Sequence, residues 1–415
     1  MKSGFSLAIL MWLVFLPIFS GAQFSLDSFL SSARNDNALA PAQAKLNFLK
    51  DNNFNSPWIN RLEVRIGSEN ADFTLDDYRL RVTPGNPSEL KANKRYHHKQ
   101  VSLLNTVYQD KLNDALLERY SLVLEHYFEY KKKENIERLL STSREIIDMM
   151  SQGKGVYAMD MGDLIDAESD ELDLKMDLVD AKLSIDELEY MMKDMQSFEG
   201  SISWRNAALL ETQDILNLFA LFKEQPGGKH IELVKIDQQN ALEAERFNIE
   251  KSESLRNIGY FQAGFDVNRG DGFSDHFGYQ IGVRIPIVNP DKAQLNRRKL
   301  NLMDNEAILY AQTETNRRDI ELAVLRMDHF AGQYHEISNK LKNMDRQNPL
   351  NLQIPGKGIK MSDLIKWNEF LIELMDKKIQ TERSIFKTYI SYLNLTGKLI
   401  EAPLRNYLSK DLNEF

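Results

Sequence analysis

The chain repeats its own organisation at an offset of 203 residues. Two short motifs of the first half recur in the second half: Asn86-Pro87 with Asn93-Lys94-Arg95 as Asn289-Pro290 with Asn296-Arg297-Arg298, and Gly153-Lys154-Gly155-Val156 as Gly356-Lys357-Gly358-Ile359. Both pairs share one offset, 289 minus 86 and 356 minus 153, so the segment between the motifs has the same length in each half. Duplication on this scale constrains the fold. It predicts a first repeat over residues 23–225, a second over 226–400 and a polar C-terminal tail over 401–415.

The N-terminus has the pattern of a secretory signal peptide. Met1-Lys2 supplies a positive start, Phe5 to Phe19 form an apolar run, and Ser20-Gly21-Ala22 provide a small-residue cleavage site. The alternative, an N-terminal membrane anchor, is disfavoured because the run is short for a bilayer span and Pro17 interrupts it. We therefore expect residues 1–22 to be removed and the mature chain to be exported, with no later transmembrane helix.

Composition narrows the class of protein. The chain of 415 residues contains no cysteine, which excludes a disulfide scaffold, cysteine chemistry and a lipid anchor on cysteine. Its net charge of −9 provides no broad basic face for nucleic acid. The lysines between the turn glycines follow no strand and precede no Ser or Thr, so they do not form a nucleotide loop. Because no catalytic triad, paired acids or metal-ligand spacing occurs, we predict no enzyme, no cofactor and no metal site.

Each half also contains a predicted β-hairpin. Ile59 to Ile66 and Arg79 to Val82 alternate in the first half, and Phe261 to Val267 and Phe277 to Ile285 alternate more regularly in the second. An apolar outer face with an inner face of Gly, Gln and Arg is typical of a transmembrane β-barrel. The alternative, the edge of a soluble sandwich, stays open on the strands alone. The residues predicted to face lipid are Phe261, Ala263, Phe265, Phe277, Tyr279, Ile281, Val283 and Ile285.

Long helices account for most of the remaining chain. Ser88 to Met150 contains neither proline nor glycine, and Asp291 to Asn348 contains only Gly332. A helix of about 60 residues is roughly 90 Å long. After each Gly-Lys-Gly turn the chain returns in a helix with heptad-like apolar spacing, which predicts coiled-coil packing between antiparallel helices. The residues at this spacing are Leu172, Met176, Val179 and Leu183 in the first half, and Leu364, Trp367, Leu371 and Leu374 in the second.

Two shorter helices complete the expected fold, which is mainly α with a β part. Ser25 to Leu49 is predicted to form one helix ahead of the first hairpin. Leu209 to Phe222 is predicted to be a short apolar helix in a lateral insertion that Gln225-Pro226-Gly227-Gly228 ends. In the second half, only Asn394 to Gly397 and the polar tail occupy the corresponding place, so we expect the tail to pack at the same height.

This order of elements resembles the TolC-like outer-membrane efflux protein family over essentially the whole mature chain. The resemblance rests on four short motifs: Phe24-Ser25-Leu26-Asp27 with Ala33, Gly282-Val283-Arg284-Ile285-Pro286-Ile287, Gly358-Ile359-Lys360-Met361-Ser362-Asp363-Leu364-Ile365, and Tyr392-Leu393-Asn394-Leu395-Thr396-Gly397. At the helical turns the spacing from glycine to aspartate is one residue shorter than is usual in the family.

The resemblance implies a homotrimer in the outer membrane of a Gram-negative bacterium. Each chain would contribute four strands to a shared 12-stranded barrel and its helices to a long periplasmic tunnel. Members of the family are passive exit ducts of tripartite efflux pumps and type I secretion systems, joined to a periplasmic adaptor and an inner-membrane RND or ABC transporter. The alternative is a periplasmic coiled-coil adaptor or scaffold protein. Adaptors generally have a single helical hairpin between small β-domains, so the two-fold repeat disfavours that alternative.

Two further groups are candidate site residues. The turns at Gly153, Gly155 and Val156 and at Gly356, Gly358 and Ile359 are predicted tips that dock the adaptor. The acids just beyond them are candidates for a lumen constriction, because a trimer converts each lumen-facing acid into a ring of three that attracts cations. The alternative is that these acids form a solvated helix face. The acids are Asp160, Asp163, Asp166 and Asp363.

Overall fold

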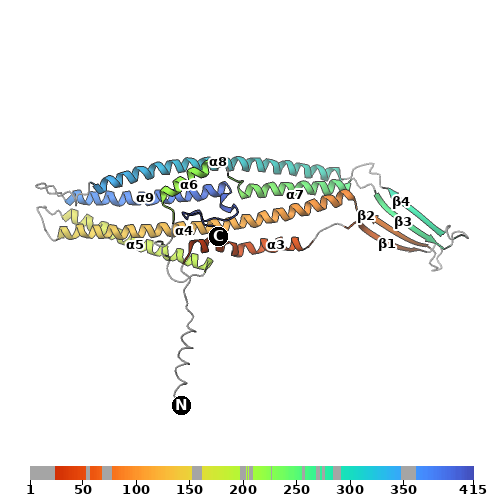
Figure 1. The fold of residues 1–415 in the computed structure, drawn as a ribbon, viewed down its shortest axis with the longest axis horizontal. Helices are drawn as coiled ribbons and strands as arrows, with labels where there is room; N and C mark the ends of the chain where they lie inside the picture. The colour runs from red at the N-terminus through yellow and green to blue at the C-terminus, as the bar shows by residue number, and fades with distance from the viewer. Residues whose placement is uncertain are drawn as a thin grey trace, which may run out of the picture. The chain divides into compact units, whose positions relative to one another are not determined.

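The structure is a computed structural model, and Figure 1 shows its helices and strands. It describes residues 24–52, 57–67, 77–151, 161–196, 202, 204, 209–225, 227–254, 258–267, 272, 276–283, 291–346 and 361–415. The predicted signal peptide and both Gly-Lys-Gly turns lie outside the described residues. In the part that is described, no helix is both long and apolar enough to cross a membrane.

The order of elements repeats as the sequence predicts. Strands β1 (Ile59–Gly67) and β2 (Asp77–Pro84) precede helices α4 (Pro87–Ser151) and α5 (Met161–Met195). Strands β3 (Ile258–Asp266) and β4 (Phe277–Val283) precede α8 (Lys292–Arg346) and α9 (Met361–Leu395). Helices α4 and α8 contain 65 and 55 residues, which confirms the long helices and the mainly α fold with a β part.

The chain divides into two compact units, and each contains segments of both predicted repeats. Residues 1–36, 114–228 and 321–415 form unit 1, and residues 37–113 and 229–320 form unit 2. The boundaries predicted for the two tandem repeats concern the order along the chain and stay a prediction. They do not coincide with the compact units.

In unit 2, polar pairs connect helix α7 (Ile231–Ser254) to the first parts of α4 and α8. Lys235 of α7 binds Asp110 of α4, with Nζ 2.6 Å from Oδ2. The arginines of the repeated motif also bind α7. Arg95 pairs with Glu245 at 3.0 Å, and Arg298 pairs with Glu250 at 3.0 Å. The recurrence of these arginines thus has a physical reason, because both long helices pair with acids of the same helix.

Asn86 gives the repeated Asn-Pro motif its local role. Its Oδ1 accepts a hydrogen bond from the backbone N–H of Ser88 at 3.1 Å, which caps the start of α4, and Pro87 is the first residue of that helix. The equivalent Asn289-Pro290 lies outside the described residues.

The prediction of one helix over Ser25 to Leu49 is wrong. The segment contains helix α2 (Leu26–Ser31), two short 3-10 turns, η1 (Ser32–Asn35) and η2 (Asn37–Leu39), and helix α3 (Ala40–Asp51). Asp36 interrupts the helical path because its backbone is extended, with φ −63° and ψ 136°. The apolar periodicity continues through the break, so the sequence pattern did not reveal it.

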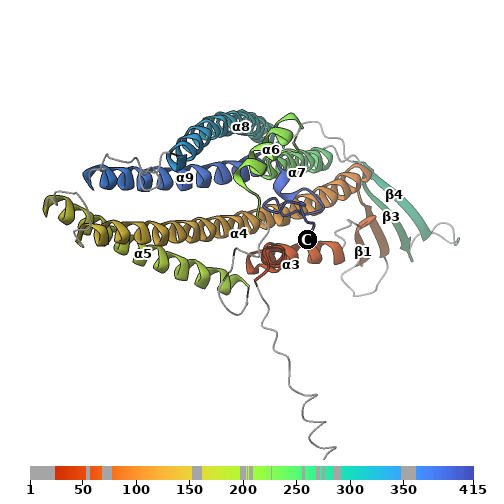
Figure 2. The same cartoon turned by 60° about the vertical axis from the view of Figure 1, so that its left-hand side comes forward.

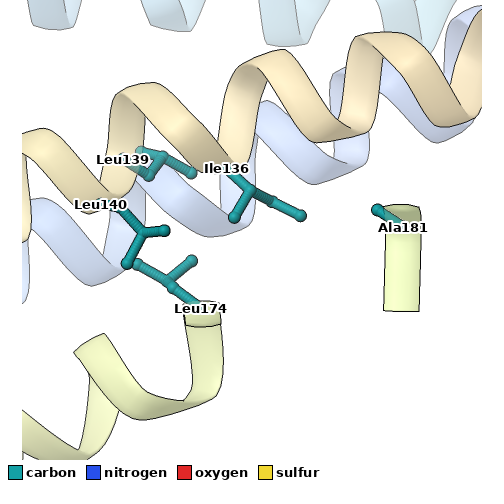
Figure 3. Packing of buried hydrophobic residues seen from close by; sticks show 5 residues of the cluster. All are labelled: Ile136, Leu139, Leu140, Leu174 and Ala181. Atoms are coloured by element: carbon teal, nitrogen blue, oxygen red, sulfur yellow. The ribbon is translucent and has the colours of Figure 1, made fainter. Parts of the chain in front are cut away.

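In unit 1, α5 runs beside α4 in both views (Figures 1 and 2). Three of its four buried residues, Ala167, Leu174 and Ala181, follow one another at intervals of seven, and the fourth is Met192. Leu174 and Ala181 face a cluster on α4 that consists of Ile136, Leu139 and Leu140 (Figure 3). Buried residues at intervals of seven that pack against a neighbouring helix are the pattern of a coiled coil.

The seam predicted for α5 is on the wrong face. Leu172, Met176, Val179 and Leu183 are 57 to 62% exposed, because α5 carries a second apolar stripe and α4 takes the stripe with the small residues. The apolar spacing predicted for α9 agrees better with the observed packing. Leu374 is buried and Leu371 packs against the cluster on α4, while the side chain of Leu364 lies outside the described residues.

The predicted insertion and the C-terminal tail pack together in unit 1. Helix α6 (Thr212–Glu224) confirms the short apolar helix. The backbone N–H of Leu210, just before it, donates to the carbonyl of Leu408 at 3.0 Å, and Leu209 forms a bridge with Ser409. The expectation that tail and insertion lie at one height is confirmed. The tail, which was predicted to be polar, also contains apolar side chains that are buried, namely Leu404, Tyr407 and Leu408.

Tyr120 of α4 joins the tail to the core. Its hydroxyl donates to the carbonyl of Arg405 at 3.0 Å and accepts from the backbone N–H of Tyr407 at 3.2 Å. Burial raises the pKa of both phenols, that of Tyr407 to about 12, so both stay protonated at neutral pH. Asn406 of the tail also donates to Asp27 at 2.6 Å, which connects the tail to helix α2.

A buried arginine stabilises the break at Asp36. Arg119 of α4 is 1% exposed and donates to Asp36 Oδ2, Ser32 Oγ and the carbonyl of Ala115, each at 3.0 Å. A buried guanidinium without a counter-charge is strongly destabilising. The ion pair therefore explains why the first segment turns at Asp36 rather than continuing as a helix.

Replacement Asp36→Asn should lower the free energy of unfolding by about 2 kcal/mol or more, because it removes only the charge opposite a buried arginine. The measurement is the denaturant midpoint of the purified protein, followed by helical circular dichroism. The matched control is Glu314→Gln, which breaks an exposed pair with Arg317 and should cost about 0.5 kcal/mol or less. Equal midpoints for the two variants would contradict this account.

A four-stranded sheet as the candidate functional site

The two β-hairpins form one antiparallel sheet in unit 2. The strand order is β1-β2-β3-β4, so the hairpin of the first half pairs with the hairpin of the second through β2 and β3. The register places Tyr78 opposite Phe265 and Leu80 opposite Ala263. The two hairpins therefore share one pleat, and residues of the same parity lie on the same face across all four strands.

One face of the sheet is apolar along three complete rows. Each row contains one residue from every strand: Leu62, Val82, Phe261 and Ile281; then Val64, Leu80, Ala263 and Tyr279; then Ile66, Tyr78, Phe265 and Phe277. Phe265 and Phe277 make an edge-to-face contact at 5.1 Å. All the described members of the predicted lipid-facing set belong to this sheet, and Ile285 lies outside the described residues.

The apolar face is open. The exposed fractions of its exposed large side chains range from 40% for Tyr78 to 90% for Tyr279. Within the described part of the chain, the four strands form a single sheet and no second sheet covers it. The soluble-sandwich alternative requires such a cover, so the structure disfavours it.

The opposite face is polar and strongly charged on the first hairpin. One row consists of Glu63, Arg81, Gln262 and Gln280, and the next of Arg65, Arg79, Gly264 and Gly278. Asp77 and Asp266 pair in the row nearest the hairpin turns. A shallow hollow of about 250 Å³ lies on this side, lined among others by Arg79, Gln262 and His276.

Tyr260 organises the polar face near the helical end of the strands. Its ring lies over Gly282, where an added Cβ would lie 2.4 to 2.9 Å from three ring atoms. The guanidinium of Arg81 stacks on the other part of this ring at 4.0 Å from its centroid, and its Nε donates to Gln262 Oε1 at 3.0 Å. An aromatic residue that covers a strand glycine pins the register of the sheet.

The predicted constriction acids are only partly described. Asp163 is half-buried, Asp166 and Asp363 are exposed, and Asp160 lies outside the described residues, as do the predicted docking tips. Asp166 lies near an acid that the sequence analysis missed. Burial raises the pKa of Asp170, and the charges of Glu369, Asp173 and Asp166 raise it further. The clue was in the sequence, because Asp166, Asp170 and Asp173 continue the same spacing of three and four residues.

The sequence analysis also missed part of the apolar face. It recognised the alternation in β1 and β2 but assigned only residues of the second hairpin to lipid. The structure adds the equivalent residues of the first hairpin, which are Leu62, Val64, Ile66, Tyr78, Leu80 and Val82. Their arginine-rich neighbours obscured a pattern that pairing with β3 makes plain.

Comparisons with known proteins identify the fold. No family model matches the sequence, and no curated protein matches it. Among solved structures, the chain is similar to the open state of the MtrE outer-membrane channel of Neisseria gonorrhoeae, with a TM-score of 0.64 and 9% identity over 90% of this chain and 88% of that one. The outer-membrane protein VceC of Vibrio cholerae gives 0.63 and 11% over 90% and 96%.

The CmeC outer-membrane channel of Campylobacter jejuni gives a TM-score of 0.58 and 12% identity over 90% of this chain and 85% of that one. At such identities the likeness concerns the fold. This chain has the fold of the TolC-like outer-membrane channels, and the resemblance predicted from its sequence is confirmed at that level.

Replacement Gly282→Ala should destabilise the sheet by about 1 to 3 kcal/mol, because the new methyl group overlaps the ring of Tyr260. The matched control is Gly264→Ala, whose methyl group would lie 3.6 Å from Arg79 Cγ in ordinary contact. The measurement is the unfolding temperature of the protein in detergent. Restoration in the double variant Tyr260→Ala with Gly282→Ala supports the overlap, and equal melting of the two single variants would contradict it.

Proposed function

We propose that this protein is one subunit of a passive, homotrimeric exit duct in the outer membrane of a Gram-negative bacterium. The observation that carries the proposal is the four-stranded sheet with an exposed apolar face and a charged opposite face. In water such a face is a liability, whereas in a bilayer it is the required lipid contact.

In a closed barrel, the two edge strands of this sheet would find hydrogen-bonding partners. Strands β1 and β4 are its edge strands, and their unpaired backbone groups cannot face the hydrocarbon core of a membrane. If β4 of one copy pairs with β1 of the next, three copies with four strands each form a barrel of 12 strands. The polar face then lines the lumen.

Exposed helix residues support the same assembly. The stripe of Leu172, Met176, Val179 and Leu183 on α5 has no cover within the chain. On the first part of α8, Leu300, Met303, Ile308 and Tyr310 are also exposed. Contiguous apolar stripes of this kind on helices are typical of interfaces, and neighbouring copies would bury them.

The duct hydrolyses nothing, so its partners supply the energy. We propose that the tips of the helical hairpins dock a periplasmic adaptor, which connects the duct to an RND or ABC transporter of an efflux pump or type I secretion system. The cargo is then a small molecule or a protein. We further propose that Asp160, Asp163, Asp166 and Asp363 contribute to a cation-attracting constriction near these tips.

An arginine on the apolar face should impair membrane assembly. Ile281→Arg places a cation against lipid, at a cost of about 2 to 4 kcal/mol per subunit near the bilayer midplane. The matched control is Gln280→Arg, the adjacent residue on the polar face. The measurement is the yield of heat-modifiable trimer in the outer-membrane fraction, with Phe265→Arg as a second apolar-face variant. Equal yields of Ile281→Arg and Gln280→Arg would refute the lipid assignment.

Photo-cross-linkers at the tips should capture the adaptor. We expect residues Val156 and Ile359 to react with a periplasmic partner, because small apolar side chains beside glycine turns provide docking anchors. The control position is Val267 at the far end of β3, which is exposed but lies at the barrel end of the duct. Capture of the adaptor from Val267 and not from the tips would reverse the proposed orientation.

A further inference from the structure

The arginines of the polar face are concentrated on the first hairpin. Arg61 and Arg65 lie on β1, and Arg79 and Arg81 lie on β2, where the register places Arg65 opposite Arg79. The positions beside this pair on β3 and β4 are Gly264 and Gly278. The arginines therefore border positions without side chains, which leaves room above the second hairpin.

The acids among these arginines are less exposed than the arginines themselves. Glu63 binds Arg61 at 2.5 Å and Arg65 at 2.9 Å, and Asp77 binds Arg79 at 2.6 Å. The arginine side chains are 50 to 72% exposed, whereas those of Glu63 and Asp77 are 16 and 18% exposed. The acids thus orient the guanidinium groups and leave them as the outermost charge.

Arg81 has a different environment. Its guanidinium stacks on Tyr260 and its Nε donates to Gln262. Stacking and one hydrogen bond hold the planar group in place, and Glu63, the acid opposite it in the register, also binds Arg61 and Arg65. A guanidinium that is fixed in this way binds a carboxylate or phosphate with less loss of side-chain entropy than a free one.

We propose that Arg61, Arg65, Arg79 and Arg81 form an anion-binding belt that lines the lumen of the barrel and favours cargo bearing carboxylate or other oxyanion groups. The belt rests on the proposed duct, since it requires the polar face to line the lumen. Among the described strand residues of this face, four arginines against Glu63, Asp77 and Asp266 leave one surplus positive charge, 4 minus 3, and hence three in the proposed trimer. The belt therefore opposes in sign the acidic constriction proposed at the tips.

The test measures ion selectivity of the purified channel in planar bilayers under a KCl gradient. The triple variant Arg65→Gln, Arg79→Gln and Arg81→Gln should lower the chloride-to-potassium permeability ratio about threefold or more at 0.1 M salt, and the effect should shrink at 1 M salt as screening increases. The matched triple lysine variant keeps the charge and should keep the ratio. Glu63→Gln should raise the ratio, and Asp160→Asn with Asp363→Asn should also raise it if those acids line the tip.

A second measurement tests the ligand chemistry. Succinate added on the barrel side should reduce the current more than succinamide of the same size. The difference should disappear in the triple glutamine variant and weaken in the triple lysine variant, because an ammonium group cannot bind a carboxylate with two parallel hydrogen bonds. Equal effects of succinate and succinamide on the unmodified channel would overturn the oxyanion preference.

The outcomes separate the belt from the duct. Unmodified protein that forms no channels would overturn the proposed duct and the belt with it. Channels whose permeability ratio is the same in the unmodified protein, the triple glutamine variant and Glu63→Gln would overturn the belt alone. If the triple glutamine variant does not assemble, Glu63→Gln decides, because an unchanged ratio in that variant overturns the belt.

Discussion

The pairing of β2 with β3 is the interaction on which the proposed function depends. Side chains alternate with a period of two along a strand, so a slip of one residue would exchange the two faces of a hairpin. The observed register places Leu80 opposite Ala263 and Arg81 opposite Gln262. Three apolar rows and a charged face result from that alignment, and neither hairpin could produce them alone. The apolar face proposed to contact lipid and the charged face proposed to line the lumen both depend on this one register.

The helices differ from the sheet, because contacts between side chains determine which of their faces pack together. Helix α5 offers two apolar stripes, and the one that contains Ala167, Leu174 and Ala181 packs within the chain. The larger residues of the other stripe stay exposed. In unit 2, ion pairs such as Lys235 with Asp110 connect the helices instead. Apolar surface is thus left exposed on both kinds of element, which agrees with the proposed assembly of several copies.

Polar contacts between distant segments stabilise unit 1 in a chain that contains no cysteine. Arg119 binds Asp36, Tyr120 binds the backbone of Arg405 and Tyr407, and Asn406 binds Asp27. These contacts join segments that are far apart in the sequence, so the entropy lost in ordering them is recovered only when the whole unit folds. The apolar side chains of α6 and the tail complete that unit.

The sequence by itself determined the repeat, the long helices, the hairpins and the apolar set of the second hairpin, because these depend on local periodicity and on where glycine and proline fall. It did not determine the break at Asp36, since apolar spacing continues across it and the buried partner, Arg119, is 83 residues away. Nor did it determine which stripe of α5 is buried, and the strand pattern alone did not join the arginine-rich hairpin to the same sheet, which only the family resemblance implied. Those choices depend on pairs of surfaces that meet only in three dimensions. Tertiary structure decided them, because each depends on a partner that is distant in the sequence and that local periodicity does not identify.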